Sequence, residues 1–171
     1  AHPGPPGPGD TMNRRRALGL LLRAPAGLAL APFVLAPLAG CGVAGPRAIR
    51  IGEEECAHCR MRISEERFAA QLLNDRGRSW VFDSIECMVE WTLQETELPQ
   101  ERISGWWVTD FEVPGSWLDA TGARYLRSEG LRSPMGLGLS AYATRDEARA
   151  QQGAHGGEIL NWEELRRVVA A

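Results

Sequence analysis

The sequence predicts an α+β fold made of two small, similar sub-domains. The order strand, turn, strand, helix, strand can be read twice along the chain, over residues 48–113 and again over residues 114–171. Hydrophobic residues make up 44% and charged residues 24% of the 171 positions, which is ordinary for a globular protein. Each half is therefore expected to hold a β-hairpin, a helix and a further strand on mixed or antiparallel sheets.

The first half is predicted to begin with a short strand at residues 48–51 and to continue with a β-hairpin. Residues 68–73 and 79–82 are rich in apolar and aromatic side chains, as strands are. Residues 74–77, Asn-Asp-Arg-Gly, supply turn formers and a glycine that can adopt positive φ.

A helix is predicted after this hairpin, from about Ser84 to Glu95, because apolar residues recur there at helical spacing. Asp83 resembles an N-cap residue, and Glu86 follows three positions later, as in a capping box. Pro99 should close the helix, and residues 102–110 read as the next strand.

The second half repeats this order with different residues. A second hairpin is expected, with strands at residues 117–120 and 123–127 around a Thr121–Gly122 turn. The remaining predicted elements are a strand at 137–143, a helix from a Thr144/Glu147 capping box to about Gln152, a loop at 153–157, a strand at 158–160 and a last helix opened by Asn161 and Glu164.

Residues 1–40 are predicted to be a leader that takes no part in the fold. Residues 1–11 are rich in glycine and proline, and Met12 is a better candidate for the initiating residue than Ala1. From Met12 the sequence has an arginine cluster followed by an apolar stretch over residues 17–39, which is typical of an export signal. Arginine and proline interrupt that stretch, so it is a poor transmembrane span.

The leader ends in Leu38-Ala39-Gly40-Cys41, which resembles a bacterial lipobox. This predicts that Cys41 is lipidated, that residues 41–47 form a short tether, and that the protein is anchored to a membrane on the periplasmic side of a bacterial cell envelope. Free thiols need a reason to persist in such an oxidising compartment, and a bound metal is one.

Four sulfur side chains form the candidate functional site. Cys56 and Cys59 have Cys-x-x-Cys spacing, Met61 follows, and Cys87 lies near the start of the predicted helix. Soft donors of this kind suit Cu(I) best and Zn(II) next, and a thioether is not a usual zinc ligand. The positive end of the helix should also favour the thiolate form of Cys87.

Other interpretations of these residues stay open. The three thiols with His58 or Asp83 could form a zinc-binding module, and Cys-x-x-Cys is also the spacing of thiol–disulfide oxidoreductases. Two thiols near Asp83 could also act as in an organomercurial lyase. Alternatively, Met61 and Cys87 could be core residues. No basic cluster is interleaved with aromatic side chains, so nothing supports nucleic-acid binding.

The order of motifs resembles the NosL family of nitrous oxide reductase accessory proteins. Cys59-Arg60-Met61-Arg62-Ile63 matches the family's Cys-x-Met-x-Ile signature. Further matches follow in order at Phe68-Ala69-Ala70, Phe82-Asp83, Val108-Thr109-Asp110, Trp117-Leu118-Asp119-Ala120, Ala123-Arg124-Tyr125, Pro134-Met135-Gly136 and His155-Gly156.

The resemblance implies a lipid-anchored periplasmic Cu(I) carrier, not an enzyme. Its partners would be a copper-enzyme maturation machinery or its ABC-type assembly complex, with nitrous oxide reductase as the final client. Cys59 and Met61 match the family's metal motif, and Met135 and His155 match further motif positions that are candidate ligands. Cys56 and Cys87 depart from better-known members, and together with Cys59 they look like small heavy-metal-binding domains of the TRASH type.

Overall fold

The computed structural model describes residues 45–94 and 98–171. The predicted leader and the lipidation site at Cys41 lie outside the described residues, as does Glu95 at the end of the predicted first helix. Over the described ranges, no helix has both the length and the apolar character needed to span a membrane.

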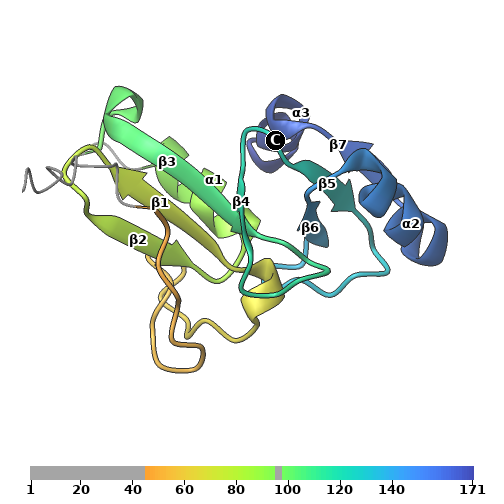
Figure 1. Ribbon diagram of the computed structural model, residues 1–171, viewed down its shortest axis with the longest axis horizontal. Helices are drawn as coiled ribbons and strands as arrows, with labels where there is room; N and C mark the ends of the chain where they lie inside the picture. The colour runs from red at the N-terminus through yellow and green to blue at the C-terminus, as the bar shows by residue number, and fades with distance from the viewer. Residues whose placement is uncertain (1–44, 95–97) are drawn as a thin grey trace, which may run out of the picture. The chain divides into compact units, whose positions relative to one another are not determined.

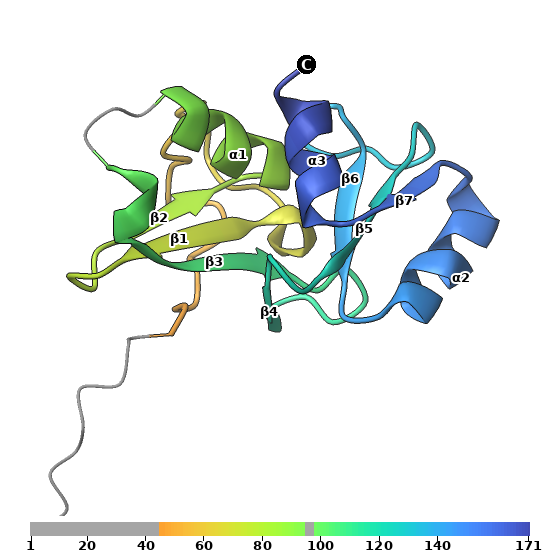
Figure 2. The same cartoon turned by 90° about the horizontal axis from the view of Figure 1, so that it is seen from above.

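The described residues form two antiparallel sheets with three α-helices (Figures 1 and 2). The first sheet and its helix comprise β1 (Ala70–Asn74), β2 (Ser79–Phe82), α1 (Ile85–Gln94), β3 (Ile103–Thr109) and β4 (Trp117–Asp119). The second sheet and its helices comprise β5 (Arg124–Arg127), β6 (Leu139–Tyr142), α2 (Arg145–His155), β7 (Glu158–Leu160) and α3 (Trp162–Val169). Single 3-10 turns at Glu66–Phe68 and Gln100–Arg102 precede β1 and β3.

The same topology occurs in both sheets, which confirms the predicted α+β class. The first sheet has the strand order β2-β1-β3-β4 and the second has the order β6-β5-β7. In each, two antiparallel strands are followed by a helix and a third strand that pairs with the first. The division of the chain at residue 113 stays a prediction.

One large apolar core contains residues from both sheets. Side chains alternate between the two faces of a strand, so Tyr125 and Leu160 face this core whereas Leu126 and Ile159 face α2. Trp162 on α3 packs edge-on against Trp106 of β3, with ring centroids 5.3 Å apart. Helix α3 thus joins the second sheet to the first, and it also contacts α1.

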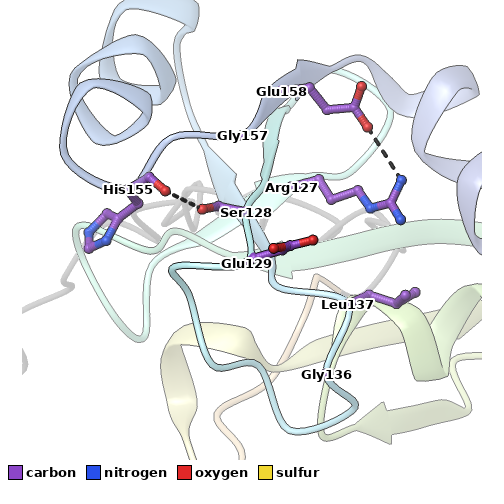
Figure 3. A pocket seen from close by; sticks show the side chains of 8 residues that line it. All are labelled: Arg127, Ser128, Glu129, Gly136, Leu137, His155, Gly157 and Glu158. Atoms are coloured by element: carbon purple, nitrogen blue, oxygen red, sulfur yellow. Dashed lines mark hydrogen bonds and ion pairs between the residues drawn. The ribbon is translucent and has the colours of Figure 1, made fainter.

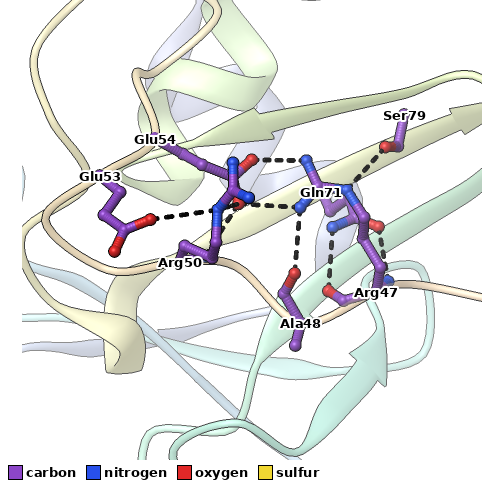
Figure 4. Close-up of polar contacts among 7 residues, drawn as sticks. All are labelled: Arg47, Ala48, Arg50, Glu53, Glu54, Gln71 and Ser79. Carbon is purple, nitrogen blue, oxygen red and sulfur yellow. Dashed lines mark hydrogen bonds and ion pairs between the residues drawn. The ribbon is translucent and has the colours of Figure 1, made fainter.

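The predicted strand at residues 48–51 is wrong. The segment is held by side chains instead of a strand ladder: the Arg47 backbone N–H donates to Gln71 Oε1 over 2.9 Å, and Gln71 Nε2 donates back to the Arg47 carbonyl over 3.2 Å (Figure 4). Arg47 also forms a two-pronged ion pair with Glu54. Within the segment, Ile49 is buried in a small apolar cluster with Ile63 and Val81.

The predicted hairpin of residues 117–127 is also wrong. Both strands exist, but β4 pairs with β3 in the first sheet and β5 pairs with β6 and β7 in the second. Asp119 Oδ1 accepts hydrogen bonds from the backbone N–H and the hydroxyl of Thr121, so the chain turns there. The Tyr125 hydroxyl then donates to the Ala120 carbonyl over 2.6 Å, fixing the crossing between the sheets.

The last two helices begin as predicted, since capping boxes are present at Thr144/Glu147 and at Asn161/Glu164. Helix α2 is longer than expected, however. It continues through Gly153 to His155, which is its last residue and does not lie in a loop. It ends where Gly156 adopts a φ of 69°, a conformation that a side chain disfavours.

Candidate metal centre

Cys56 and Cys59 lie in a tight hairpin of residues 55–62. Glu55 and Arg62 form an antiparallel bridge at its base, and the Cys56 N–H donates to the Met61 carbonyl over 2.8 Å. The Arg60 N–H donates to the Cys56 carbonyl over 3.2 Å, and Arg60 has a φ of 64°. The backbone therefore reverses within four residues, which brings the two cysteines of the motif close together.

The hairpin is attached to the free edge of the first sheet. β2 is the edge strand, and its Val81 carbonyl accepts a 2.9 Å hydrogen bond from the Ala57 N–H. From β2 the chain runs directly into α1, whose third residue is Cys87. The attachment thus brings a Cys-x-x-Cys hairpin beside the first turn of a helix that carries a third cysteine.

The predicted N-cap of this helix is wrong, because Ser84 and not Asp83 has that role. The Cys87 N–H donates to Ser84 Oγ over 3.2 Å, and the Met88 N–H donates to the Ser84 carbonyl. Asp83 instead accepts the Ser64 N–H through Oδ1 over 2.8 Å, so it joins the end of β2 to the segment before β1. Glu86 is therefore not a capping partner.

The sulfur atoms of Cys56, Cys59 and Cys87 all lie within 4.8 Å of one another. All three are free thiols. Cys56 and Cys87 are fully buried, whereas Cys59 is partly exposed. The three sulfurs form a pre-assembled trigonal group with one member accessible from outside.

Hydrogen bonds lower the pKa of the Cys56 thiol to about 5. The Cys87 thiol makes the largest contribution by donating to the Cys56 sulfur, and the backbone N–H groups of Asp83, Cys59 and His58 add to it, whereas burial opposes ionisation. The bond to Cys56 raises the pKa of Cys87, so the predicted preference of Cys87 for the thiolate form is wrong. Burial raises the pKa of Cys59. The hydrogen bonds of the group thus favour the thiolate form at Cys56, and a thiolate is a soft anionic donor.

Two potential fourth ligands are engaged elsewhere. His58 Nε2 lies 2.9 Å from Glu90 Oε2, one turn beyond Cys87 on α1. Asp83 Oδ1 is bonded to Ser64. Among the described residues, the histidines and carboxylates do not join the three cysteines as a cluster.

The other predicted ligands lie in three different places. Met61 lies in the cysteine hairpin and is 49% exposed. Met135 is 36% exposed on the loop between β5 and β6. His155 is not brought into the cysteine group, and it lines a cavity of about 610 Å³ together with Arg127, Glu129 and Glu158 (Figure 3). The metal-binding roles of these residues stay predictions.

Glu86 is a buried carboxylate whose position the sequence did not reveal. Its side chain is inaccessible to solvent, and burial raises its pKa. Oε1 accepts a 2.7 Å hydrogen bond from the Ser133 hydroxyl, whereas Oε2 has no hydrogen-bond partner within the described part of the chain. The only sequence signal was a glutamate next to Cys87, which the pattern assigned to helix capping.

The fold and the three-cysteine group define a class: α+β proteins with a Cys-x-x-Cys hairpin at a sheet edge, beside a third cysteine on a helix. The family model of NosL matches residues 49–170, so the chain belongs to the NosL family. It is 29% identical over 164 residues to a copper-binding lipoprotein NosL of Stutzerimonas stutzeri, covering 89% of this chain and 86% of that one.

A solved structure has the same fold. The copper chaperone NosL from Shewanella denitrificans superposes with a TM-score of 0.57 at 17% sequence identity, covering 71% of this chain and 96% of that one. At that identity the likeness concerns the fold alone.

Proposed function

We propose that this protein is an exported, lipid-anchored carrier of Cu(I) that delivers copper for the maturation of a periplasmic copper enzyme, with nitrous oxide reductase as the client. The observation that carries the proposal is the trigonal group of Cys56, Cys59 and Cys87. Family membership and a relative named as a copper-binding lipoprotein support it. Copper is the cargo here, and no chemical reaction is assigned to the protein.

The geometry favours Cu(I) over zinc. Structural zinc is almost always tetrahedral, and the fourth ligand would have to come from a group such as His58 or Asp83. Both are engaged, with Glu90 and Ser64 respectively. Cu(I) is satisfied by soft sulfur donors alone, which this site supplies.

The geometry also disfavours a thiol oxidoreductase or an organomercurial lyase. In thioredoxin-like enzymes the Cys-x-x-Cys motif lies near a βαβ unit, whereas Cys56 and Cys59 lie in a hairpin closed by the Glu55–Arg62 bridge. The lyase interpretation needs a free carboxylate beside the thiols, and Asp83 is bonded to Ser64.

Cu(I) competition under anaerobic conditions tests the proposal. In a Cys41→Ser background that avoids lipidation, the chain should bind one Cu(I) in competition with a Cu(I)-specific chelator. Loss of Cys59 should abolish binding, because it removes the accessible thiol. Loss of Cys87 should weaken binding by about tenfold while lowering the sulfur count seen by X-ray absorption, since one metal–sulfur bond is lost.

Two comparisons make this test decisive. Met88→Leu changes a fully buried thioether one residue beyond Cys87 and should leave affinity unchanged. Purified protein that holds stoichiometric zinc, or that binds Cu(I) no better than a Cys59→Ser/Met61→Ala double variant, would refute the carrier function.

The client is tested separately. In cells lacking this gene, nitrous oxide reductase should accumulate with a reduced copper content, and wild-type but not Cys59→Ser protein should restore it. A nitrous oxide reductase with its full copper content in the deletion strain would show that this protein carries copper for a different enzyme.

A further inference from the structure

The buried carboxylate of Glu86 is bonded to Ser133, whose hydroxyl oxygen closes the loop of residues 133–138. At the start of the loop, Ser133 donates its hydroxyl to Glu86 Oε1 over 2.7 Å. At its end, the Gly138 N–H donates to Ser133 Oγ over 2.9 Å. One side chain of the first sheet's helix thus fixes a loop that belongs to the second.

This loop presents a methionine. Gly136 has a φ of 85°, and its N–H donates to the Ser133 carbonyl over 3.1 Å, so Met135 occupies the tip of a tight turn. Leu137 packs against the large apolar core shared by the two sheets, and Figure 3 shows how Gly136 and Leu137 follow one another along the loop. The Met135 side chain remains partly exposed.

Glu86 also lies directly before Cys87 in α1. Ser84 Oγ accepts the Cys87 N–H, and Glu86 lies between these two residues in the first turn of α1. A buried carboxylate with one unpartnered oxygen is unfavourable for stability, and such residues tend to occur where function requires them. The first turn of α1 therefore carries both Cys87 and the carboxylate that is bonded to the loop of Met135.

We propose that Glu86 is a positioning residue of the copper site: by fixing the 133–138 loop to the first turn of α1, it presents the Met135 thioether to copper held by the cysteines. This inference rests on the proposed Cu(I) function. Glu86 does not touch the ion; it determines where Met135 stands. The cysteine hairpin and α1 then supply thiolates, and the second sheet supplies the thioether that completes the site.

Methyl NMR of the Cys41→Ser chain labelled with [methyl-¹³C]methionine tests this, because Cu(I) is diamagnetic and a bound thioether shifts its methyl signal. Addition of Cu(I) should shift the Met135 methyl. In Ser133→Ala and in Glu86→Leu that shift should be lost while the Met61 methyl responds as in wild type. Cu(I) affinity should fall about tenfold, a typical effect of removing a group that orients a ligand. Glu86→Gln keeps the acceptor for Ser133 and should behave as wild type.

Each alternative outcome has a defined meaning. A Met135 shift that persists in Ser133→Ala and Glu86→Leu overturns the role of Glu86, and Ser133→Ala alone is sufficient if Glu86→Leu does not fold. A wild-type chain that binds Cu(I) without any response of Met135 overturns the inference and leaves the carrier function standing. Failure to bind Cu(I) at all would refute the proposed function itself.

Discussion

At the scale of single residues, the candidate metal centre departs from the capping pattern of the other two helices. Helices α2 and α3 carry a glutamate three positions after the N-cap, at Glu147 and Glu164, and each closes a capping box. In α1 the same position is Cys87. A thiol thus occupies the position of the capping partner at the candidate metal site, and departures from local rules of this kind are expected at functional positions.

Arg60 is a second departure, and it leads to a prediction. Its φ of 64° is left-handed, which disfavours an L-residue by about 1–2 kcal/mol, whereas glycine adopts it freely. Because glycine also loses more entropy on folding, Arg60→Gly should raise the free energy of unfolding by about 0.5–1 kcal/mol. Urea unfolding of the metal-free protein measures this.

Arg76 provides the control for charge and side-chain loss. It is exposed in the β1–β2 turn without a positive φ, so Arg76→Gly should give no stabilisation. Equal effects of the two substitutions would show that backbone strain at Arg60 is not the cause.

At the scale of elements, the segment before the cysteine hairpin is fixed by the ion pair of Arg47 and Glu54. The hydrogen bond from Arg47 lowers the pKa of Glu54 to about 2. A carboxyl group with a lowered pKa in the folded state stabilises the protein above its ordinary pKa, and this contribution is lost as the pH falls toward the folded-state value.

Glu54→Gln should therefore lower the free energy of unfolding by about 1 kcal/mol at pH 7, since Arg47 is half-exposed and partly screened. The difference from wild type should shrink between pH 4.5 and pH 2, where wild-type Glu54 becomes protonated. Glu53→Gln is the matched control, because both side chains of its contact with Arg50 are well exposed. A difference that stays constant with pH would exclude the ion pair as its source.

The sequence predicted best those elements that local signals determine. Residues 79–82 and 158–160 are strands with the predicted bounds, and both capping boxes were recognised, because alternation and capping act within a few residues. The partner of a strand is a tertiary property, so the pairing of β4 with β3 could not be inferred from the turn at Thr121. Asp83 and Ser84 are both residue types that favour the N-cap position. The contact of Asp83 with Ser64, which is distant in sequence, leaves Ser84 as the N-cap.

The candidate site was predictable to a similar extent. Cys56, Cys59 and Cys87 were singled out by residue type and spacing, and the structure brings their sulfurs together. Glu86 is bonded to Ser133, a residue 47 positions away, and no sequence pattern predicts that contact. Long-range polar contacts of this kind leave no local pattern in a single sequence.

At the scale of the whole molecule, the shared core should make the two sheets unfold together. Trp162 is 7% exposed and contacts Trp106 of the first sheet and Tyr125 of the second. Trp162→Ala should lower the free energy of unfolding by about 3–5 kcal/mol, with circular dichroism and hydrogen exchange of β1 and β5 reporting a single transition. Val113→Ala, at a position 57% exposed, should cost less than about 0.5 kcal/mol. Separate transitions of β1 and β5 would indicate two independent folding units.

Membrane attachment is also a property of the whole molecule. If Cys41 carries the lipid, Cys41→Ser should move the protein from the membrane fraction to the soluble periplasmic fraction, because two or three acyl chains supply the anchoring energy. Its thermal unfolding should match that of the wild-type domain. A Cys41→Ser protein that still sediments with membranes would rule out this anchor.

The unequal exposure of the three cysteines has a consequence for how copper would leave. Cu(I) passes between proteins by stepwise ligand exchange, in which an incoming sulfur attacks before an old bond breaks. Cys59 is partly exposed to solvent, whereas Cys56 and Cys87 are buried in the core. Release should therefore begin at Cys59, and its rate should rise with the concentration of the acceptor. A docked client would thus determine when the cargo departs, and dilution alone would not release it.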